Sequence, residues 1–149
     1  MSKKTKHLPA PALVNRTQFR VRFSDIDSMQ IVWHGQYIRY FEDGREAFGA
    51  QFGLRYMDIH AAGYMAPIVD VNCQYKLSLS FNDEVIIETA YYPTQAAKIQ
   101  FHYTVFRASD MAVCATGSST QVFINANTRE LEICNPNFFV EWKKRNNIK

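Results

Sequence analysis

The sequence lacks long hydrophobic runs. Its 149 residues contain no apolar stretch near the roughly 18–20 residues that a transmembrane helix needs. The basic start over residues 1–7 is followed by proline and alanine rather than by the apolar core of a signal peptide. We therefore expect a cytoplasmic protein with no membrane partner. The chain also lacks internal repeats and low-complexity linkers, and its length suits one domain.

Cysteine is scarce. Cys73, Cys114 and Cys134 stand far apart, and neither a CxxC motif nor closely spaced histidines accompany them. This pattern argues against a zinc site and a disulfide framework. It is typical of thiols that are buried in a protein of a reducing compartment. The sequence therefore predicts no metal site and no redox cofactor.

Acidic residues are absent from the beginning of the chain. Residues 1–22 carry six basic side chains and no acidic one, while residues 141–149 carry four basic side chains and one acidic one. The region between them is acidic, although the whole chain has a net charge of +3. We expect a solvated basic tail over residues 1–16. A nucleic-acid binder would need a basic face with interleaved aromatics on ordered elements, so no nucleic-acid partner is expected.

A strand followed by a long helix is indicated in the first third of the chain. Residues 17–23 alternate between apolar and polar side chains, as in a half-buried strand. From Gln36 the apolar period changes to that of an amphipathic helix, whose broad stripe is rich in aromatic residues. The helix is expected to run for about four turns and to end near Gly49 or Gly53.

Strands dominate the remainder. A short helix ending at Gly63 is followed by alternating patterns over 69–80, 84–92, 98–107 and 112–124. Short connections between such strands predict antiparallel hairpins. Residues 130–134 are expected to add a short strand, and Pro136 to start a final helix that ends near Arg145. One helix cannot cover both faces of this sheet, and residues 85–91 and 113–124 are apolar on both faces, which favours an oligomer.

The segment over residues 22–37 (RFSDIDSMQIVWHGQY) carries the chemistry. It places Asp25 and Asp27, with Trp33 and His34, between a strand and the start of a helix. The free N–H groups of a helix N-terminus can polarise a carbonyl oxygen. A carboxylate just before them can act as a base or nucleophile. This arrangement suits acyl transfer or hydrolysis, although aspartate beside serine is also common in local turns and caps.

The same segment resembles the signature of the hot-dog-fold acyl-CoA thioesterases of the 4-hydroxybenzoyl-CoA thioesterase type. In that signature an aromatic residue and two aspartates precede an [IV]-V-[YW]-H run, a tyrosine and an E-x-x-R pair. The matching residues here are Phe23, Asp25, Asp27, Ile31, Val32, Trp33, His34, Tyr37, Glu42 and Arg45. Further matches are Pro67-Ile68-Val69, Tyr75-Lys76 and Asn82-Asp83-Glu84.

The resemblance covers residues 17–140 and implies one α+β domain with the hot-dog fold, in which a curved antiparallel sheet wraps a long central helix. Residues 136–149 would form a C-terminal helix and tail. It also implies that two subunits join their sheets edge to edge, with the active site at the interface, in a homodimer or homotetramer. The expected substrate is an acyl-CoA thioester, or the thioester of an acyl-carrier protein, and no cofactor is implied.

The resemblance also implies a role for each site residue. Asp27 would be the catalytic carboxylate, as nucleophile or general base, and the backbone N–H of His34 would polarise the thioester carbonyl. The His34 imidazole could bond the carboxylate or the leaving thiol, or be structural. Trp33 and Tyr37 would line the acyl pocket or simply be core aromatics. Lys76 would meet a CoA phosphate or be solvated.

Two features keep alternatives open. Gln30 stands where the commonest signature has glycine, which leaves room for a non-catalytic acyl-CoA or acyl-carrier-protein binding scaffold. Glu46 is a rival carboxylate, because another hot-dog branch places its catalytic acid on the central helix, but the motif of that branch does not match here. Asp25 is expected to be a turn residue.

Overall fold

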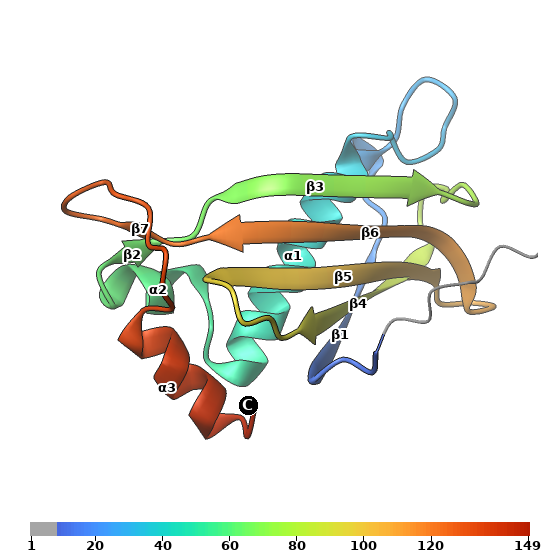
Figure 1. The fold of residues 1–149 in the computed structure, drawn as a ribbon. Coiled ribbons are helices and arrows are strands. Elements are labelled where there is room, and N and C mark those ends of the chain that lie inside the picture. Colours follow the sequence, from blue (N-terminus) through green and yellow to red (C-terminus); the bar gives the residue numbers. More distant parts are fainter. Residues whose placement is uncertain (1–8) are drawn as a thin grey trace, which may run out of the picture.

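The computed structural model describes residues 9–149, so residues 1–8 of the predicted basic tail lie outside the described residues. Five antiparallel strands form a sheet in the order β1-β4-β5-β6-β3 (Figure 1). Their bounds are Leu13–Arg20 for β1, Ile68–Tyr75 for β3, Glu84–Tyr92 for β4, Lys98–Arg107 for β5 and Ala112–Val122 for β6. Short turns join β5 to its neighbours β4 and β6, as expected for antiparallel hairpins.

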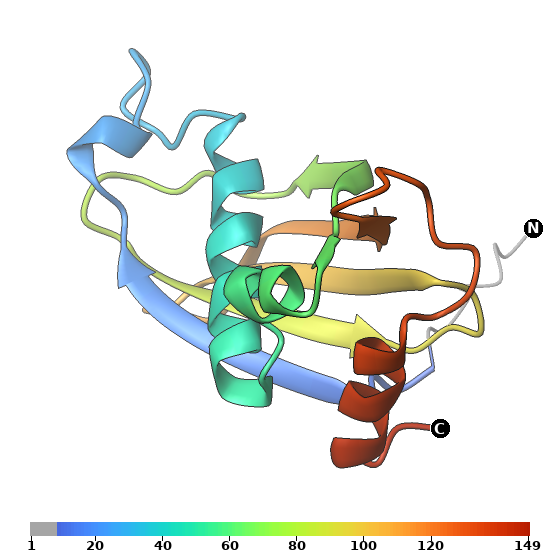
Figure 2. The ribbon, with the colours of Figure 1, turned by 90° about the vertical axis from the view of Figure 1, so that its left-hand side faces the viewer.

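The long helix α1 (Gln36–Phe52) crosses one face of the sheet, which curves around it (Figures 1 and 2). Its aromatic stripe explains this packing, because Tyr40, Phe41 and Phe48 are at most 1% exposed. The helix ends at Gly53, whose left-handed φ of 76° closes the last turn. The α+β architecture predicted from the sequence is confirmed.

Smaller elements close one end of the sheet. They are the helices α2 (Tyr56–Ala61) and α3 (Asn137–Arg145) and the ribbon of β2 (Tyr64–Met65) with β7 (Ile124–Asn125). Pro136 immediately precedes α3, as predicted. The buried Trp142 of α3 donates a hydrogen bond from Nε1 to the carbonyl oxygen of Phe52 at 2.7 Å, which ties α3 to the end of α1. None of the helices within residues 9–149 has the length and apolar character needed to cross a membrane.

Four strand predictions differ from the structure. The one over 112–124 divides into β6, which ends at Val122, and β7, which pairs outside the main sheet. The first strand covers Leu13–Arg20 rather than 17–23, because its ladder with β4 runs from Arg20 back to Leu13. The strand predicted over 69–80 stops at Tyr75 and is largely exposed on both faces, because β3 forms an edge of the sheet. The strand predicted over 130–134 is wrong, since Leu131 makes only an isolated bridge.

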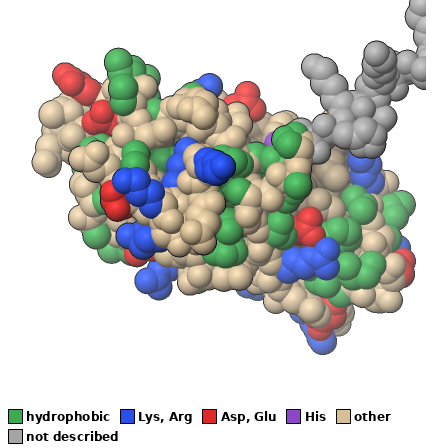
Figure 3. Space-filling model, turned by 60° about the horizontal axis from the view of Figure 1, so that its bottom comes forward, with side chains coloured by type: hydrophobic (Ala, Val, Ile, Leu, Met, Phe, Trp, Pro, Cys, Tyr) green, Lys and Arg blue, Asp and Glu red, His purple; other side chains and the backbone are tan. Residues whose placement is uncertain are grey.

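The outer face of the sheet, away from α1, is largely polar, so the apolar second face expected from the sequence is wrong. Outward residues of β3, β5 and β6 are mostly amides and hydroxyls, among them Asn72, Thr104 and Ser118. On β1 and β4, Arg16 pairs with Glu88 at 2.7 Å. On the side shown in Figure 3, Lys and Arg side chains are dispersed among acidic and uncharged ones rather than gathered in one basic patch.

The cysteines differ in burial. Cys114 is buried and Cys73 is half-buried, both within strands, but Cys134 is exposed, so its predicted burial is wrong. Cys134 belongs to the segment where the expected short strand does not form, and therefore no sheet covers its side chain.

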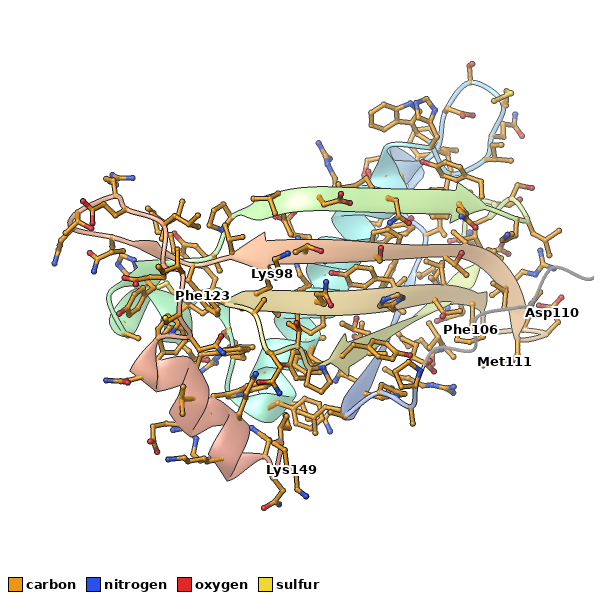
Figure 4. The ribbon with its side chains drawn as sticks, in the orientation of Figure 1. Lys98, Phe106, Asp110, Met111, Phe123 and Lys149 are labelled. Atoms are coloured by element: carbon orange, nitrogen blue, oxygen red, sulfur yellow. The ribbon has the colours of Figure 1, made fainter. Side chains whose placement is uncertain are left out.

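An exposed ion pair holds the turn between β5 and β6. Arg107 donates from Nε and Nη2 to the two carboxylate oxygens of Asp110, at 3.0 and 2.8 Å. Figure 4 shows Asp110 and Met111 at the tip between the strands. Hydrogen bonds from Arg107 and from the N–H of Ala112 lower the pKa of the Asp110 carboxyl from 3.8 to about 2.

Candidate active site

A buried carboxylate anchors the segment between β1 and α1. Residues Phe23–Asp25 form a short 3-10 turn. Asp25 is 4% exposed and accepts hydrogen bonds from the N–H of Arg22 at 3.0 Å and from the hydroxyl of Tyr40 at 2.9 Å. Burial, together with this carboxylate, raises the pKa of Tyr40 far above its ordinary value, so the hydroxyl remains a donor. Asp25 thus ties the segment to α1, in agreement with the predicted turn role.

The next turn carries Asp27. The N–H of Asp27 donates to the carbonyl of Ile31, and the N–H of Gln30 donates to the carbonyl of Asp27, both at 2.9 Å. Gln30 has a φ of 63°, a left-handed conformation that glycine adopts freely but that costs other residues about 1–2 kcal/mol. Glutamine therefore keeps, at a cost, a backbone conformation that would suit the glycine of the signature.

Asp27 is half-buried and lines a cavity. Its Oδ1 accepts a hydrogen bond from the N–H of Met29 at 2.8 Å. Its Oδ2 has no donor among the described residues. The cavity has a volume of about 240 Å³, and the apolar side chains of Ile31, Val32 and Leu77 form part of its wall. A carboxylate with a free oxygen in such surroundings can act as a base or nucleophile.

The turn that leads into α1 also reaches this cavity, since His34 is one of its lining residues. Gly35 is the N-cap of α1, and the carbonyl of Trp33 accepts the N–H of Gln36 at 2.9 Å. In a trans peptide the C=O and the following N–H point in opposite directions. The N–H of His34 therefore points away from the helix body, and it finds no acceptor within residues 9–149. It carries part of the positive charge of a helix N-terminus.

Four of the five predicted site residues line this one cavity, namely Asp27, His34, Tyr37 and Lys76. Tyr37 is buried, whereas His34 and Lys76 are exposed. Trp33 does not line the cavity. Its ring folds back over Gly35, where a Cβ atom would come within 2.4 Å of the ring, and lies 5.1 Å from the His34 ring. Trp33 is thus the one predicted site residue that does not share this cavity.

Two further polar residues of the cavity, Tyr75 and Ser78, are not among the predicted site residues. The Tyr75 hydroxyl donates to the carbonyl oxygen of His34 at 2.6 Å. Its ring meets that of Tyr37 edge-on, at a centroid distance of 5.2 Å. The pair Tyr75-Lys76 belongs to the signature, so the motif marked this position without indicating what the side chain contacts.

The rival carboxylate Glu46 lies elsewhere. It lines a second cavity, of about 500 Å³, between α1, α2 and the beginning of β3. Glu42 and Asp43 share that cavity, and burial raises the pKa of Asp43. No residue lines both this cavity and that of Asp27. Within one chain, Glu46 and Asp27 therefore line separate cavities.

Comparison with known proteins identifies the family of the chain. Residues 21–144 match the family model described as the thioesterase-like superfamily. A Bacillus subtilis protein named "Putative acyl-CoA thioesterase YneP" is 29% identical over 106 residues, which cover 70% of this chain and 77% of that protein. An Aquifex aeolicus protein named "Putative esterase" is 31% identical over 94 residues, which cover 63% of this chain and 73% of that protein.

Solved structures share the fold. The DHNA-CoA thioesterase from Staphylococcus aureus superposes with a TM-score of 0.80 at 23% identity, covering 89% of each chain. A 4-hydroxybenzoyl-CoA thioesterase mutant, complexed with 4-hydroxybenzoyl-CoA, superposes with a TM-score of 0.74 at 22% identity, covering 87% of this chain and 97% of that one. The chain therefore belongs to the thioesterase-like superfamily, and the hot-dog thioesterase relationship predicted from its sequence is confirmed.

Proposed function

We propose that this chain hydrolyses acyl-CoA thioesters to the free acid and CoA, with Asp27 as the catalytic carboxylate. The proposal is carried by one observation, the cavity that Asp27 and His34 line together. The similarity to a Bacillus subtilis protein named as an acyl-CoA thioesterase supports the choice of substrate class. The complex of a structural relative with 4-hydroxybenzoyl-CoA supports it further.

In the proposed reaction, the thioester oxygen accepts a hydrogen bond from the His34 N–H. Asp27 then either attacks the carbonyl carbon, forming an anhydride that water hydrolyses, or removes a proton from the attacking water. On both routes the C–S bond breaks, CoA leaves as the thiolate and takes up a proton. The negative charge on the carbonyl oxygen is stabilised by an N–H dipole that is already oriented. The exposed His34 imidazole is available to bond the leaving sulfur.

The decisive experiment measures release of the CoA thiol from aromatic, short-chain and long-chain acyl-CoA substrates. Asp27→Asn keeps the shape but removes the base or nucleophile, so kcat is expected to fall about 10²-fold or more. Asp110→Asn is the matched control, because this exposed carboxylate lies in the β5–β6 turn and lines neither cavity. Unchanged turnover in Asp27→Asn would refute the assignment. Tight acyl-CoA binding without turnover in the wild type would favour the scaffold alternative.

We also propose that the working unit is a homodimer joined through β3. This edge strand leaves its pairing groups free along one side, and its exposed apolar side chains include Val69, Val71 and Tyr75. Antiparallel pairing around a two-fold axis at the middle of β3 would bring the Ile68 end of one strand beside the Tyr75 end of the other. Ile68 borders the cavity of Glu46, and Tyr75 borders that of Asp27. The two cavities would then meet across the interface.

Lys76 is proposed to bind a phosphate of CoA. It directly follows β3, lines the Asp27 cavity and is exposed. An exposed ammonium can pair with a phosphate at the mouth of the site without the cost of burying its charge. An acyl-carrier protein presents its thioester on a phosphopantetheine arm, so the same lysine could serve that substrate.

A further inference from the structure

The hydroxyl of Tyr75 makes a hydrogen bond that has no part in the reaction proposed above. Tyr75 is the last residue of β3, and it donates to the carbonyl oxygen of His34, which is 41 residues away in the sequence, at 2.6 Å. The edge-on contact with the buried Tyr37 fixes the direction of the ring. Burial raises the pKa of Tyr75, so the hydroxyl carries its proton at neutral pH.

This hydrogen bond fixes a peptide plane at the start of α1. The carbonyl of His34 and the N–H of Gly35 belong to one trans peptide unit and point in opposite directions. The preceding unit is fixed separately, because the carbonyl of Trp33 accepts the N–H of Gln36. Helix geometry therefore orients the N–H of His34, and the Tyr75 hydroxyl orients the N–H of Gly35. Neither N–H has an acceptor within the described part of the chain.

Without the Tyr75 hydroxyl, the unit between His34 and Gly35 would be free to rotate. Its carbonyl could then turn toward the cavity and repel the developing negative charge of a substrate oxygen. Donors that are fixed before the reaction stabilise such charge without reorganisation.

We propose that Tyr75 is a positioning residue. By holding the carbonyl of His34 it fixes the His34–Gly35 peptide, and with it the residue whose own N–H polarises the thioester carbonyl. The inference rests on the proposed thioesterase function and adds to it a residue that acts through the backbone of His34. It predicts that the hydroxyl matters for the chemical step and little for substrate binding.

The test compares Tyr75→Phe with the wild type. Phenylalanine keeps the ring contact with Tyr37 and removes only the hydroxyl. We expect kcat to fall about 10-fold, less than the 10²–10³-fold loss typical for removing a direct oxyanion donor, while KM changes less than about twofold. Tyr92→Phe is the matched control, because Tyr92 lies on the outer face of the sheet and lines neither cavity. Circular dichroism and light scattering check that fold and assembly are unchanged.

A spectroscopic measurement separates positioning from mere packing. The substrate for this measurement is the acyl-CoA of the panel that the wild type cleaves fastest, labelled with ¹³C at the thioester carbonyl. Bound to the Asp27→Asn variant, it reports the polarisation of that carbonyl through its infrared stretching frequency. Adding Tyr75→Phe should move this band back toward its frequency in water. An unchanged band, or a kcat equal to that of the wild type, would overturn the Tyr75 inference alone. Absence of turnover in the wild type would instead overturn the proposed function.

Discussion

Gln30 holds the loop that carries Asp27 in a conformation better suited to glycine. Replacing it with glycine removes the left-handed strain of about 1–2 kcal/mol and adds a chain-entropy cost of about 0.5–1 kcal/mol. We expect Gln30→Gly to raise the free energy of unfolding by up to about 1 kcal/mol and to retain activity. Gln30→Val should lower it by about 1–2 kcal/mol, since β-branched residues tolerate positive φ least.

Urea unfolding measures both changes at Gln30. The control is Gln95→Gly, at an exposed position between β4 and β5 where φ is not positive. There the same substitution should bring no gain in stability. A loss of stability in Gln30→Gly as large as in Gln30→Val would contradict the strain argument.

Lys76 provides a second prediction at this scale. If it pairs with a CoA phosphate, Lys76→Gln should raise KM for acyl-CoA about 2–5-fold, the range of an exposed ion pair. It should leave KM unchanged for the N-acetylcysteamine thioester of the same acid, which carries no phosphate. Lys98→Gln is the control, because Lys98 is exposed at the start of β5, and it should alter neither constant. Equal effects on both substrates would exclude the phosphate role.

The sequence motif located Asp27, His34, Tyr37 and Lys76, which the structure gathers around one cavity. It could not reveal the contact of Tyr75, because a hydrogen bond from the end of β3 to the start of α1 depends on tertiary placement. It left Trp33 as either a pocket residue or a core aromatic. The ring instead folds over Gly35, and a rotamer choice of this kind leaves no mark on residue spacing.

Among the elements, the hairpin of β5 and β6 gives a prediction about pH. The pKa of Asp110 is about 2 in the folded chain, below its ordinary 3.8. Its charged form therefore contributes stability above pH 3.8, and this contribution is lost as the pH falls through about 2. We expect Asp110→Asn to melt at a lower temperature than the wild type at pH 7, and the difference to shrink toward zero near pH 2.

Melting curves from pH 7 to pH 2 check this expectation. Arg107→Gln removes the partner of the same ion pair, and should give a similar decrease at pH 7. Since both side chains are partly exposed, the effect is small and should weaken in high salt. A melting difference that stays constant over the whole pH range would show that the charge of Asp110 is not its origin.

The helices and strands were predicted well where one face of the element is buried, because burial imposes a regular spacing of apolar side chains. The period of α1 and the alternation of β4 and β5 gave their bounds because the inner faces of these elements are buried. The alternation over 69–80 misled, because residues beyond Tyr75 continue the pattern without pairing to β6 as a strand. The pairing of β7 with β2 was not foreseen, since two-residue strands carry no period.

For the whole molecule, the proposed dimer can be tested at the two edges of the sheet. Val71 on β3 and Val14 on β1 are similarly exposed, at 41% and 39%. In a two-fold pairing through β3, lysines at position 71 of the two chains would lie near each other and repel. We expect Val71→Lys to be monomeric by light scattering and to lose activity. Val14→Lys should stay dimeric and active, and a monomeric wild type would contradict the proposal.

The free edge of β3 has a consequence for kinetic measurements. If the Asp27 cavity is completed only by a second chain, activity depends on an association that dilution reverses. The initial rate should then rise faster than linearly with enzyme concentration, and specific activity should decline as the enzyme is diluted below its dissociation constant. Rates taken at one low concentration would underestimate kcat, and long preincubation of dilute enzyme would resemble inactivation that higher concentration restores.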